Sequence, residues 1–268
     1  MRISSLGEFV GRHRKLFILT GAGCSTDSGI PDYRDENGSW KRTRPVSFQS
    51  FMGSAAVRQR YWARSLSGWQ HFRRARPNRA HQALARLEQQ GRLELLLTQN
   101  VDGLHQAAGS TRVIDLHGRL DWVRCMDCYD VISREELQAE LLRLNPRWAR
   151  LEGRMAPDGD ADIEGLAFDD FVVPSCSRCD GILKPDVVFF GESVPRARVD
   201  EAMQRLARAD AVLVVGSSLM VYSGYRFVQA AAQSGKPVAA VNLGRTRADE
   251  LLTLKISEPC AVALAALA

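Results

Sequence analysis

Residues 15–34 of this chain read KLFILTGAGCSTDSGIPDYR. The continuous apolar run Leu16–Leu19 predicts a short strand that is buried on both faces of a parallel sheet. Gly21 and Gly23 then allow the backbone to turn tightly and to approach a ligand closely. Because a helix that starts after such a turn directs free N–H groups at phosphate, the stretch predicts the entry of a dinucleotide site.

The stretch departs from the ordinary dinucleotide fingerprint in two ways. Ser25 and Thr26 stand in the region of the third glycine, and no acidic residue follows about 20 residues later to hold a ribose. The loop instead carries Gly29-Ile30-Pro31-Asp32-Tyr33-Arg34, a rigid proline beside a carboxylate and a guanidinium. A fold built only for hydride transfer has no need of this loop.

Composition indicates an ordinary globular protein. The chain has 268 residues, 45% apolar content and a formal net charge of +5. Its apolar runs fall short of the roughly 20 residues that span a bilayer, and the first predicted strand leaves no room for a signal peptide. We therefore expect a cytoplasmic protein whose six cysteines are reduced or metal-bound. The basic residues lack the context of a nucleic-acid reader, so we expect no specific nucleic-acid or membrane partner.

Alternating patterns predict a doubly wound α/β fold. The expected strands are Leu16–Thr20, Leu93–Thr98, Val113–Leu116, Ala211–Gly216, Val238–Asn242 and Leu254–Ser257. The expected helices are Ala55–Trp69, Ala80–Gln90, Glu135–Leu144, Val199–Ala209 and Tyr222–Ser234. Between them the pattern breaks into short pieces. We expect a Rossmann-like domain formed by residues 1–121 and 189–268, with a smaller zinc-binding domain inserted at 122–188.

Four cysteines form two Cys-x-x-Cys pairs, Cys125 with Cys128 and Cys176 with Cys179. Each pair places two thiolates on one tight turn, and four thiolates suit tetrahedral Zn²⁺. Four independent buried cysteines and a redox motif are the alternatives. With all four positions taken by thiolates, such a zinc site is structural. Cys24 and Cys260 fall outside the pattern and are expected to act as small apolar residues.

Polar side chains follow the second and third predicted strands. Gln99, Asn100 and Asp102 come directly after Leu93–Thr98, at the carboxyl end of a parallel strand where such folds bind ligands. Alternation places Asp115 and His117 on one face of the next strand. A histidine at a strand end suits a general base, although a core or surface role is the alternative for His117, and a buried structural network is the alternative for the amide pair.

Over nearly its whole length the chain resembles the sirtuins, the NAD-dependent protein lysine deacylases. The matching blocks, in order, are GAGCSTDSGIPDYR, TQNVDGLH, DLHG, the two Cys-x-x-Cys pairs, LKPDVVFFGE, GSSL and VNLG. RQRYWAR (58–64), NPRW (145–148), APDGD (156–160) and VYSGYRF (221–227) extend the resemblance to the class II branch, which includes the fourth mammalian sirtuin. The resemblance implies that the enzyme consumes NAD⁺, releases nicotinamide and leaves the acyl group on ADP-ribose.

The resemblance also implies roles for individual residues. His117 matches the general base, and Asn100 and Asp102 are the other expected catalytic residues. The positions that match the cofactor site are Gly21, Ala22, Gly23, Ser25, Thr26, Pro31, Asp32, Tyr33, Arg34, Gln99, Asn100, Asp102, Gly216, Ser217, Ser218, Asn242, Leu243, Gly244 and Cys260. The strip that pairs with the substrate main chain matches Val188, Phe189, Phe190, Gly191 and Glu192.

Two questions stay open at the level of sequence. Tyr61 and Arg64 have the spacing of a pair that holds acidic acyl groups in class III sirtuins, yet Tyr61 in the core and Arg64 on the surface is an equal alternative. We expect acetyl and longer, branched or lipoyl-type acyl groups to be preferred. ADP-ribosyl transfer and NAD hydrolysis use the same cofactor site, and an NAD-sensing or peptide-binding module without turnover is a third possibility.

Overall fold

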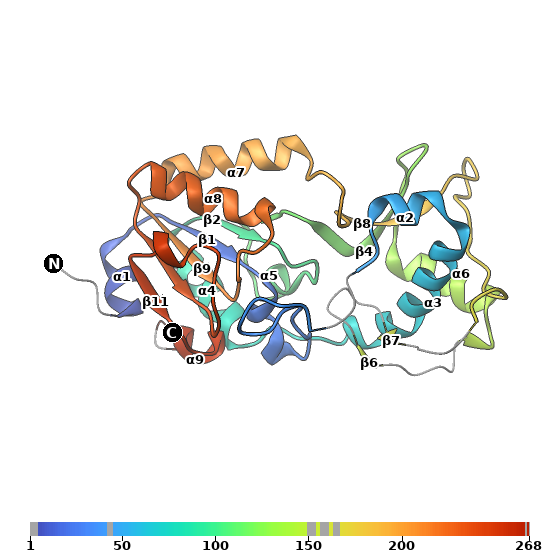
Figure 1. Cartoon of the computed structure of the whole chain (residues 1–268), viewed down its shortest axis with the longest axis horizontal. Coiled ribbons are helices and arrows are strands. Elements are labelled where there is room, and N and C mark those ends of the chain that lie inside the picture. Colours follow the sequence, from blue (N-terminus) through green and yellow to red (C-terminus); the bar gives the residue numbers. More distant parts are fainter. Residues whose placement is uncertain are drawn as a thin grey trace. The chain divides into compact units, whose positions relative to one another are not determined.

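The computed structural model describes residues 5–41, 45–148, 154–155, 161–162, 167–265 and 267. The chain divides into two compact units. Unit 1 comprises Met1–Thr43, Arg76–Leu116 and Val194–Ala268, and unit 2 comprises Arg44–Ala75 and His117–Ser193. The APDGD motif at 156–160 lies outside the described residues. Each unit has its own sheet (Figure 1), and each packs around buried hydrophobic residues of its own.

Unit 1 contains a six-stranded sheet in the order β3-β2-β1-β9-β10-β11, and all its strand pairs are parallel. Counted along the chain within this unit, the order is 3-2-1-4-5-6, which is that of the Rossmann fold. The strands are β1 (Leu16–Thr20), β2 (Leu93–Thr98), β3 (Val113–Asp115), β9 (Ala211–Val215), β10 (Val238–Val241) and β11 (Leu254–Ile256). The predicted doubly wound parallel sheet is confirmed.

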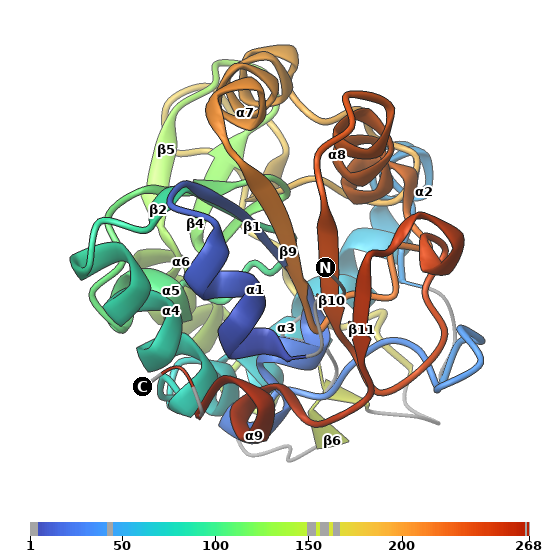
Figure 2. The same cartoon turned by 90° about the vertical axis from the view of Figure 1, so that its left-hand side faces the viewer.

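Helices cover both faces of this sheet. They are α1 (Leu6–Arg12), α4 (Arg79–Gln89), α5 (Leu104–Ala107), α7 (Arg196–Arg208), α8 (Tyr222–Gln233) and α9 (Cys260–Ala265). Short 3₁₀ turns occupy Ala22–Cys24, Thr26–Ser28 and Asp249–Leu251. Figure 2 shows α7 and α8 on one side of the sheet and α1 and α9 on the other.

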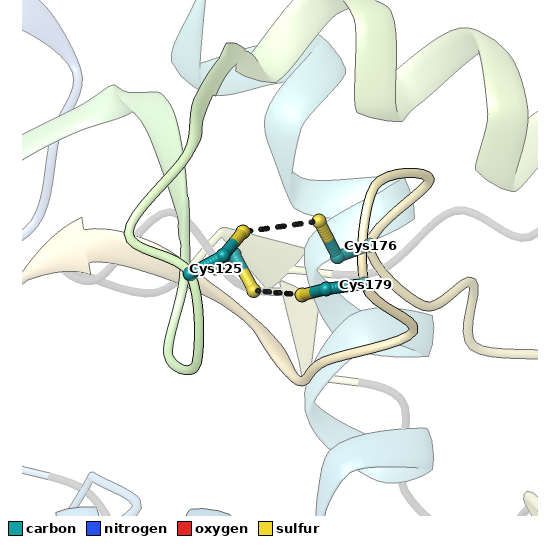
Figure 3. Close-up of side chains that lie close together, drawn as sticks. Cys125, Cys176 and Cys179 are labelled. Atoms are coloured by element: carbon teal, nitrogen blue, oxygen red, sulfur yellow. Dashed lines mark hydrogen bonds between the residues drawn. The ribbon is translucent and has the colours of Figure 1, made fainter.

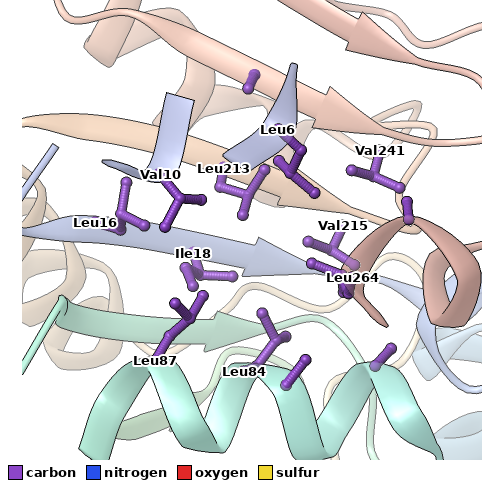
Figure 4. Packing of buried hydrophobic residues seen from close by; sticks show 14 of the residues in the cluster. Leu6, Val10, Leu16, Ile18, Leu84, Leu87, Leu213, Val215, Val241 and Leu264 are labelled. Atoms are coloured by element: carbon purple, nitrogen blue, oxygen red, sulfur yellow. The ribbon is translucent and has the colours of Figure 1, made fainter. Parts of the chain in front are cut away.

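Alternate residues of each strand face opposite cores, as the period of a strand requires. Leu16 and Ile18 of β1 pack with α1, α4 and α9 in one core (Figure 4), whereas Phe17 and Leu19 pack with α7 and α8 in the other. Every residue of β1 is buried. This burial on both faces explains why β1 is a continuous apolar run and does not alternate.

Unit 2 is built around a small antiparallel sheet in the order β5-β4-β8. Its elements are β4 (Gly118–Cys125), β5 (Val131–Ser133), β6 (Arg154–Met155), β7 (Ala161–Asp162), β8 (Leu183–Val187), α2 (Phe48–Gly53), α3 (Ala55–Phe72) and α6 (Arg134–Leu144). Trp62 of α3 shares a core with Val123 of β4 and Leu141 of α6. This shared core is why residues 44–75 group with 117–193.

The predicted elements match the observed ones to within three residues at each end. Asn78 caps α4, and Ser133 with Glu136 forms the predicted capping box of α6. Residues 44–75 lie within the predicted nucleotide-binding part of the chain, whereas in the structure α2 and α3 share the core of unit 2. The domain boundaries 1–121, 122–188 and 189–268 stay a prediction.

Candidate functional site

The switch point of the sheet in unit 1 lies between β1 and β9, where strand order reverses. In open parallel sheets this is where ligands bind, beyond the carboxyl ends of the strands. The turn after β1 and the turn after β9 meet here. The N–H of Gly21 donates to Val215 O at 3.1 Å, and the N–H of Gly23 donates to Gly216 O at 2.9 Å. The predicted glycine turn therefore sits at the predicted end of the sheet.

These two turns touch backbone to backbone, and only glycine permits the contact. Gly216 has a positive φ of 63°, and a Cβ built on it would lie 2.2 Å from the backbone nitrogen of Cys24. A Cβ on Gly23 would lie 3.0 Å from Gly216 O. Because glycines stand at the contact, the two turns pack closely, and a ligand could approach their main chain.

A hydrogen-bonded polar network lies beside the turns. The hydroxyl of Ser25 donates to Asp102 Oδ2 at 2.7 Å, and Asn100 Nδ2 lies 3.0 Å from both Ser25 Oγ and Gly21 O. The N–H of Leu104 donates to the second oxygen of Asp102 at 2.9 Å. The structure thus brings Ser25, Asn100 and Asp102, three predicted cofactor-site residues, into direct contact.

His81 belongs to this network and was missed by the sequence analysis. It is fully buried, and its Nε2 lies 3.5 Å from Ser25 Oγ. Its Nδ1 accepts the Asn78 N–H in the capping box of α4, so the proton resides on Nε2 and points to Ser25. Burial lowers the pKa of His81, and the charge of Asp102 opposes that shift. The sequence does contain a signal for a structural role of His81. In Asn78-x-x-His81 the histidine takes the third position of a helix that has a buried face.

Gln99 is tied to the turn after β9. The Ser217 hydroxyl donates to Gln99 Oε1 at 2.7 Å and accepts the N–H of Leu219 at 3.2 Å. A Cβ on Gly224 would lie 2.6 Å from Gln99 Nε2, so the missing side chain at the start of α8 leaves room for this amide. Ser217, after β9, and the open space at Gly224 of α8 therefore hold Gln99, which follows β2.

The loop that carries Pro31, Asp32, Tyr33 and Arg34 folds back on itself. Asp32 forms an ion pair with Lys41 at 2.6 Å, and the Arg34 guanidinium lies 4.0 Å from the centre of the Trp40 ring. Arg34 and Trp40 also form an isolated antiparallel bridge. The predicted cofactor loop is a small closed hairpin, and the N–H of Arg245 also bonds to its Glu36 carbonyl at 2.8 Å.

Residues predicted for the adenosine side follow β10. Asn242 Nδ2 donates to Gly244 O at 3.0 Å, while the Leu243 side chain is exposed. A Cβ on Gly244 would lie 2.4 Å from Glu36 O. Ser218 lies in the turn after β9, and its carbonyl accepts the Arg247 N–H at 2.9 Å.

The two cysteines outside the quartet are both buried, as predicted. Burial raises the pKa of Cys260 to about 12, and burial together with the charge of Cys260 raises that of Cys24 well above its ordinary value. Both therefore carry neutral thiols and act as small apolar residues.

His105 lies beneath the network. It is 1% exposed, its Nε2 lies 2.9 Å from Thr20 Oγ1, and its ring centre lies 4.7 Å from that of His81. Its Nδ1 has no hydrogen-bond partner among the described residues. Burial lowers the pKa of His105 well below its ordinary value, and His81 adds to that shift. A histidine so enclosed cannot meet a substrate.

Cys24 lies close to these two histidines, with one possible ligand atom of each residue within 4.8 Å of the others. Both nitrogens of His81 already serve hydrogen bonds. We therefore interpret Cys24, His81 and His105 as residues of the packed core beneath the polar network.

His117 belongs to unit 2, where it precedes β4. Its carbonyl accepts the N–H of Val188 at 2.8 Å, and its side chain is half-buried. The next residue, Gly118, has a φ of 82°, and a Cβ there would lie 2.0 Å from Asp186 O. The glycine of DLHG is therefore required for β4 and β8 to meet beside His117.

The segment Val188–Glu192 follows β8. The carbonyl of Phe190 accepts the N–H of Phe48 at 2.9 Å, and that of Gly191 accepts Gln49 Nε2 at 3.0 Å. Glu192 turns back to accept the N–H of Phe189 at 2.8 Å. The start of α2 and a local carboxylate thus fix the shape of this segment.

Tyr61 and Arg64 lie on α3. Tyr61 is 4% exposed, and its ring packs edge-on against Phe51 at 5.3 Å and tilted against Phe189 at 5.4 Å. This places Tyr61 in an aromatic cluster that includes one residue of the predicted substrate strip. Arg64 is half-buried. An acyl-binding role for the pair stays a prediction.

Figure 3 shows the cysteine quartet in unit 2. Cys125 Sγ lies 3.5 Å from Cys179 Sγ, Cys128 Sγ lies 3.7 Å from Cys176 Sγ, and all four sulfurs lie within 4.8 Å of one another. Four thiolates bound to tetrahedral zinc at about 2.3 Å would be about 3.8 Å apart. The two Cys-x-x-Cys turns match each other, since the N–H of Tyr129 bonds to Cys125 O and that of Asp180 bonds to Cys176 O. The predicted quartet fits one structural zinc ion.

The helices of the described ranges include none long and apolar enough to cross a membrane.

Comparison with known proteins gives a consistent result. Residues 21–223 match the Sir2 family model. A protein of Xanthomonas campestris pv. campestris (strain 8004), named NAD-dependent protein deacetylase, is 68% identical over 261 residues, which cover 97% of this chain and 89% of that protein. The mitochondrial NAD-dependent protein lipoamidase sirtuin-4 of Bos taurus is 48% identical over 97% of this chain and 83% of its own length.

A solved structure described as "Sir2-p53 peptide-NAD+" superposes with a TM-score of 0.80 at 31% identity, covering 98% of this chain and 96% of that one. The doubly wound parallel sheet of unit 1 agrees with this likeness of fold. The chain therefore belongs to the Sir2 family, the sirtuins.

Proposed function

We propose that this protein is an NAD-dependent protein lysine deacylase that releases nicotinamide and O-acyl-ADP-ribose. The observation that carries the proposal is the Ser25–Asn100–Asp102 network, placed at the switch point of a Rossmann sheet in a chain that matches the Sir2 model over residues 21–223. The deacetylase and lipoamidase names of its relatives support acyl-lysine as the substrate.

The residues of unit 1 suit NAD⁺. The glycine turns at Gly21–Gly23 and Gly216 would let the diphosphate approach the main chain closely, and Asn242 with its neighbours would hold the adenosine. Asn100 and Asp102, together with Gln99, would hold the nicotinamide ribose. When bound, NAD⁺ supplies the ADP-ribose that accepts the acyl group. The contacts of Asn100 with Ser25 and Gly21 fix the amide in place before any ligand arrives.

His117 is assigned as the general base. Its imidazole accepts a proton from a ribose hydroxyl, and a histidine suits this task because its ordinary pKa lies near neutral pH. His105 is excluded from this role by its burial. The chain needs no nucleophile of its own, since the acyl oxygen of the substrate would attack the ribose carbon from which nicotinamide leaves.

The zinc site is assigned a structural role. With Cys125, Cys128, Cys176 and Cys179 as ligands, the ion has no open position and cannot activate water. It would instead hold the two turns together in a unit with a small sheet.

The substrate strip Val188–Glu192 would pair with the main chain of an acyl-lysine peptide. The lipoamidase name of one relative supports longer or lipoyl-type acyl groups beside acetyl. We assign the protein to the cytoplasm, without nucleic-acid or membrane partners.

The acyl preference can be tested on Arg64. We expect kcat/KM for acetyl-lysine and long acyl-lysine peptides to exceed that for succinyl-lysine. If Arg64 did pair with an acidic acyl group, Arg64→Met would cut succinyl activity by about tenfold or more, because a charge-assisted pair contributes about 1.5–3 kcal/mol. Succinyl activity above acetyl activity, lost in Arg64→Met, would overturn the expected preference.

The main experiment is incubation of the protein with NAD⁺ and an acyl-lysine peptide array. Acylated ADP-ribose and free lysine peptide are the expected products. ADP-ribosylated protein would instead identify a transferase, free ADP-ribose alone would identify an NAD glycohydrolase, and unchanged NAD⁺ would identify a module without turnover. The zinc-loaded wild-type chain is used, so that loss of unit 2 cannot mimic inactivity.

A further inference from the structure

Lys184 is a buried cation beneath the substrate strip. It lies on β8, is 3% exposed, and its Nζ is 3.1 Å from Glu192 Oε2. The same ammonium donates to the carbonyl of Val187 and, at 3.3 Å, to that of Pro185. Its three N–H groups therefore have three partners, all within a segment of nine residues. Sequence analysis gave Lys184 no role.

Burial of this ammonium is costly. The Phe189 ring centre lies 4.6 Å from Nζ and that of Phe48 lies 5.9 Å away, so the cation sits among aromatic rings. Burial lowers the pKa of Lys184, and the charge of Glu192 opposes this shift. Apolar side chains of similar size often stabilise a core as well as a buried ion pair does. Stability alone therefore does not explain why the Lys184–Glu192 pair is buried. The role to test is the arrangement of the backbone next to the pair.

The ion pair closes the strip at both ends. Lys184 holds the carbonyl of Val187, directly before the strip, and Glu192, the last residue of the strip, accepts the N–H of Phe189. The carbonyl of Phe190 between them is held by the N-terminal turn of α2. One buried pair thus fixes the backbone path from Val187 to Glu192.

We propose that Lys184 is a positioning residue: through its contacts with Val187 and Glu192 it holds the strip, including the turn that the Glu192 N–H closes on Phe189 O at 3.0 Å, in the form that pairs with the substrate main chain. The inference rests on the proposed function, because it assumes that Val188–Glu192 binds the peptide. Pairing of two backbones requires several aligned groups, so loosening the strip should weaken peptide binding more than the chemical step.

The first experiment compares Lys184→Met with Lys236→Met. Methionine keeps most of the apolar stem and removes the N–H donors. Lys236 is a matched control in unit 1, since its Nζ also donates to two backbone carbonyls, those of Ala207 and Ala209. We expect Lys184→Met to raise the KM for an acetyl-lysine peptide at least tenfold, with kcat and the KM for NAD⁺ within threefold of wild type. Lys236→Met should change none of the three.

Lys184→Arg keeps the charge and donors, and should recover at least part of the lost peptide affinity. Zinc content and thermal unfolding show whether each variant is folded. If Lys184→Met fails to fold, Glu192→Gln replaces it, because the amide keeps an acceptor for the Phe189 N–H and loses the ion pair. The same rise in peptide KM is expected.

The second experiment tests main-chain pairing directly. A peptide N-methylated at the amide next to acetyl-lysine loses a backbone donor. For each protein we compare the affinity for the methylated peptide with that for the unmethylated one. We expect methylation to weaken binding by a clearly larger factor in the wild type than in Lys184→Met, because the strip of the variant is already misaligned. Equal factors would overturn the proposal, as would an unchanged peptide KM in a folded Lys184→Met with an active wild type. A wild type without deacylation would refute the proposed function instead.

Discussion

The two units build their candidate binding surfaces in different ways. In unit 1 the surface is built by backbone packing, since the turns after β1 and β9 meet through glycines. In unit 2 the strip after β8 is held by backbone bonds to His117 and Phe48 and, in addition, by the side chains of Lys184, Glu192 and Gln49. Backbone packing on a six-stranded sheet tolerates few substitutions at the contact itself. Because side chains help to hold the strip in unit 2, loss of one ion pair can change the conformation of the strip.

The stability of the two units should differ most when zinc is removed. Unit 1 has a core on each face of its sheet, whereas unit 2 has a three-stranded sheet and the cysteine quartet. Because zinc contributes about 10–16 kcal/mol in small zinc-finger peptides, Cys176→Ala or chelation should unfold unit 2 and spare the sheet of unit 1. Hydrogen exchange resolved by segment, with zinc analysis, checks this.

Cys24→Ala is the control, and should retain one zinc per chain. Slow exchange in β4 and β8 after zinc loss would show that the ion is dispensable. Replacing zinc with cobalt should leave the pH–rate profile unchanged, because a closed site takes no part in the chemistry.

His117→Ala tests the part of the reaction assigned to unit 2. Removal of a general base typically lowers the rate by about 10²–10⁴-fold, and we expect a loss in that range with an intact fold. His71→Ala alters an exposed histidine on α3 of the same unit and should retain full activity. Turnover of His117→Ala within threefold of wild type would refute the assignment.

Gly216→Ala tests the backbone contact of unit 1. A new Cβ would meet the Cys24 nitrogen at 2.2 Å, and the left-handed conformation alone costs a non-glycine residue about 1–2 kcal/mol. We expect the affinity for NAD⁺, measured by calorimetry, to fall at least about tenfold, since about 1.4 kcal/mol corresponds to one decade. Gly235→Ala carries the same strain, at a φ of 70°, but meets open space. It should lower stability slightly and leave the affinity unchanged.

Acid should weaken unit 1 through its buried histidines. Burial lowers the pKa of both His81 and His105 from 6.5, so below pH 6.5 the unfolded chain binds more protons than the folded one. Stability is therefore complete above pH 6.5 and falls below it by about 1.4 kcal/mol per pH unit for each proton. Chemical unfolding between pH 7.5 and 5.5, with zinc content followed, measures this slope.

In this experiment His105→Asn should give a shallower slope than wild type, while exposed His71→Gln should leave it unchanged. The same slope in all three proteins would mean that groups other than the buried histidines control acid stability.

Sequence reasoning succeeded where one local pattern determines one local structure. The apolar run of β1, the caps of α4 and α6, and the cysteine spacing each predict their own geometry. Asn100 and Asp102 could be assigned to the end of a strand for the same reason. Contacts between distant segments could not be read in this way. Nothing local shows that Trp62 packs with Val123, that His81 reaches Ser25, or that Lys184 pairs with Glu192 beneath a strip.

The position of β1 has a consequence for how the chain is made. Leu16 pairs with Leu93 on one side and with Ala211 on the other. During synthesis β1 and β2 emerge early, yet β9 appears only after most of the chain has left the ribosome, and bringing such distant segments together slows folding. Until then β1 is an unprotected edge of apolar residues, the kind of strand that pairs with other chains. The nascent protein is thus most exposed to aggregation at the strand that ends up in the middle of the finished sheet.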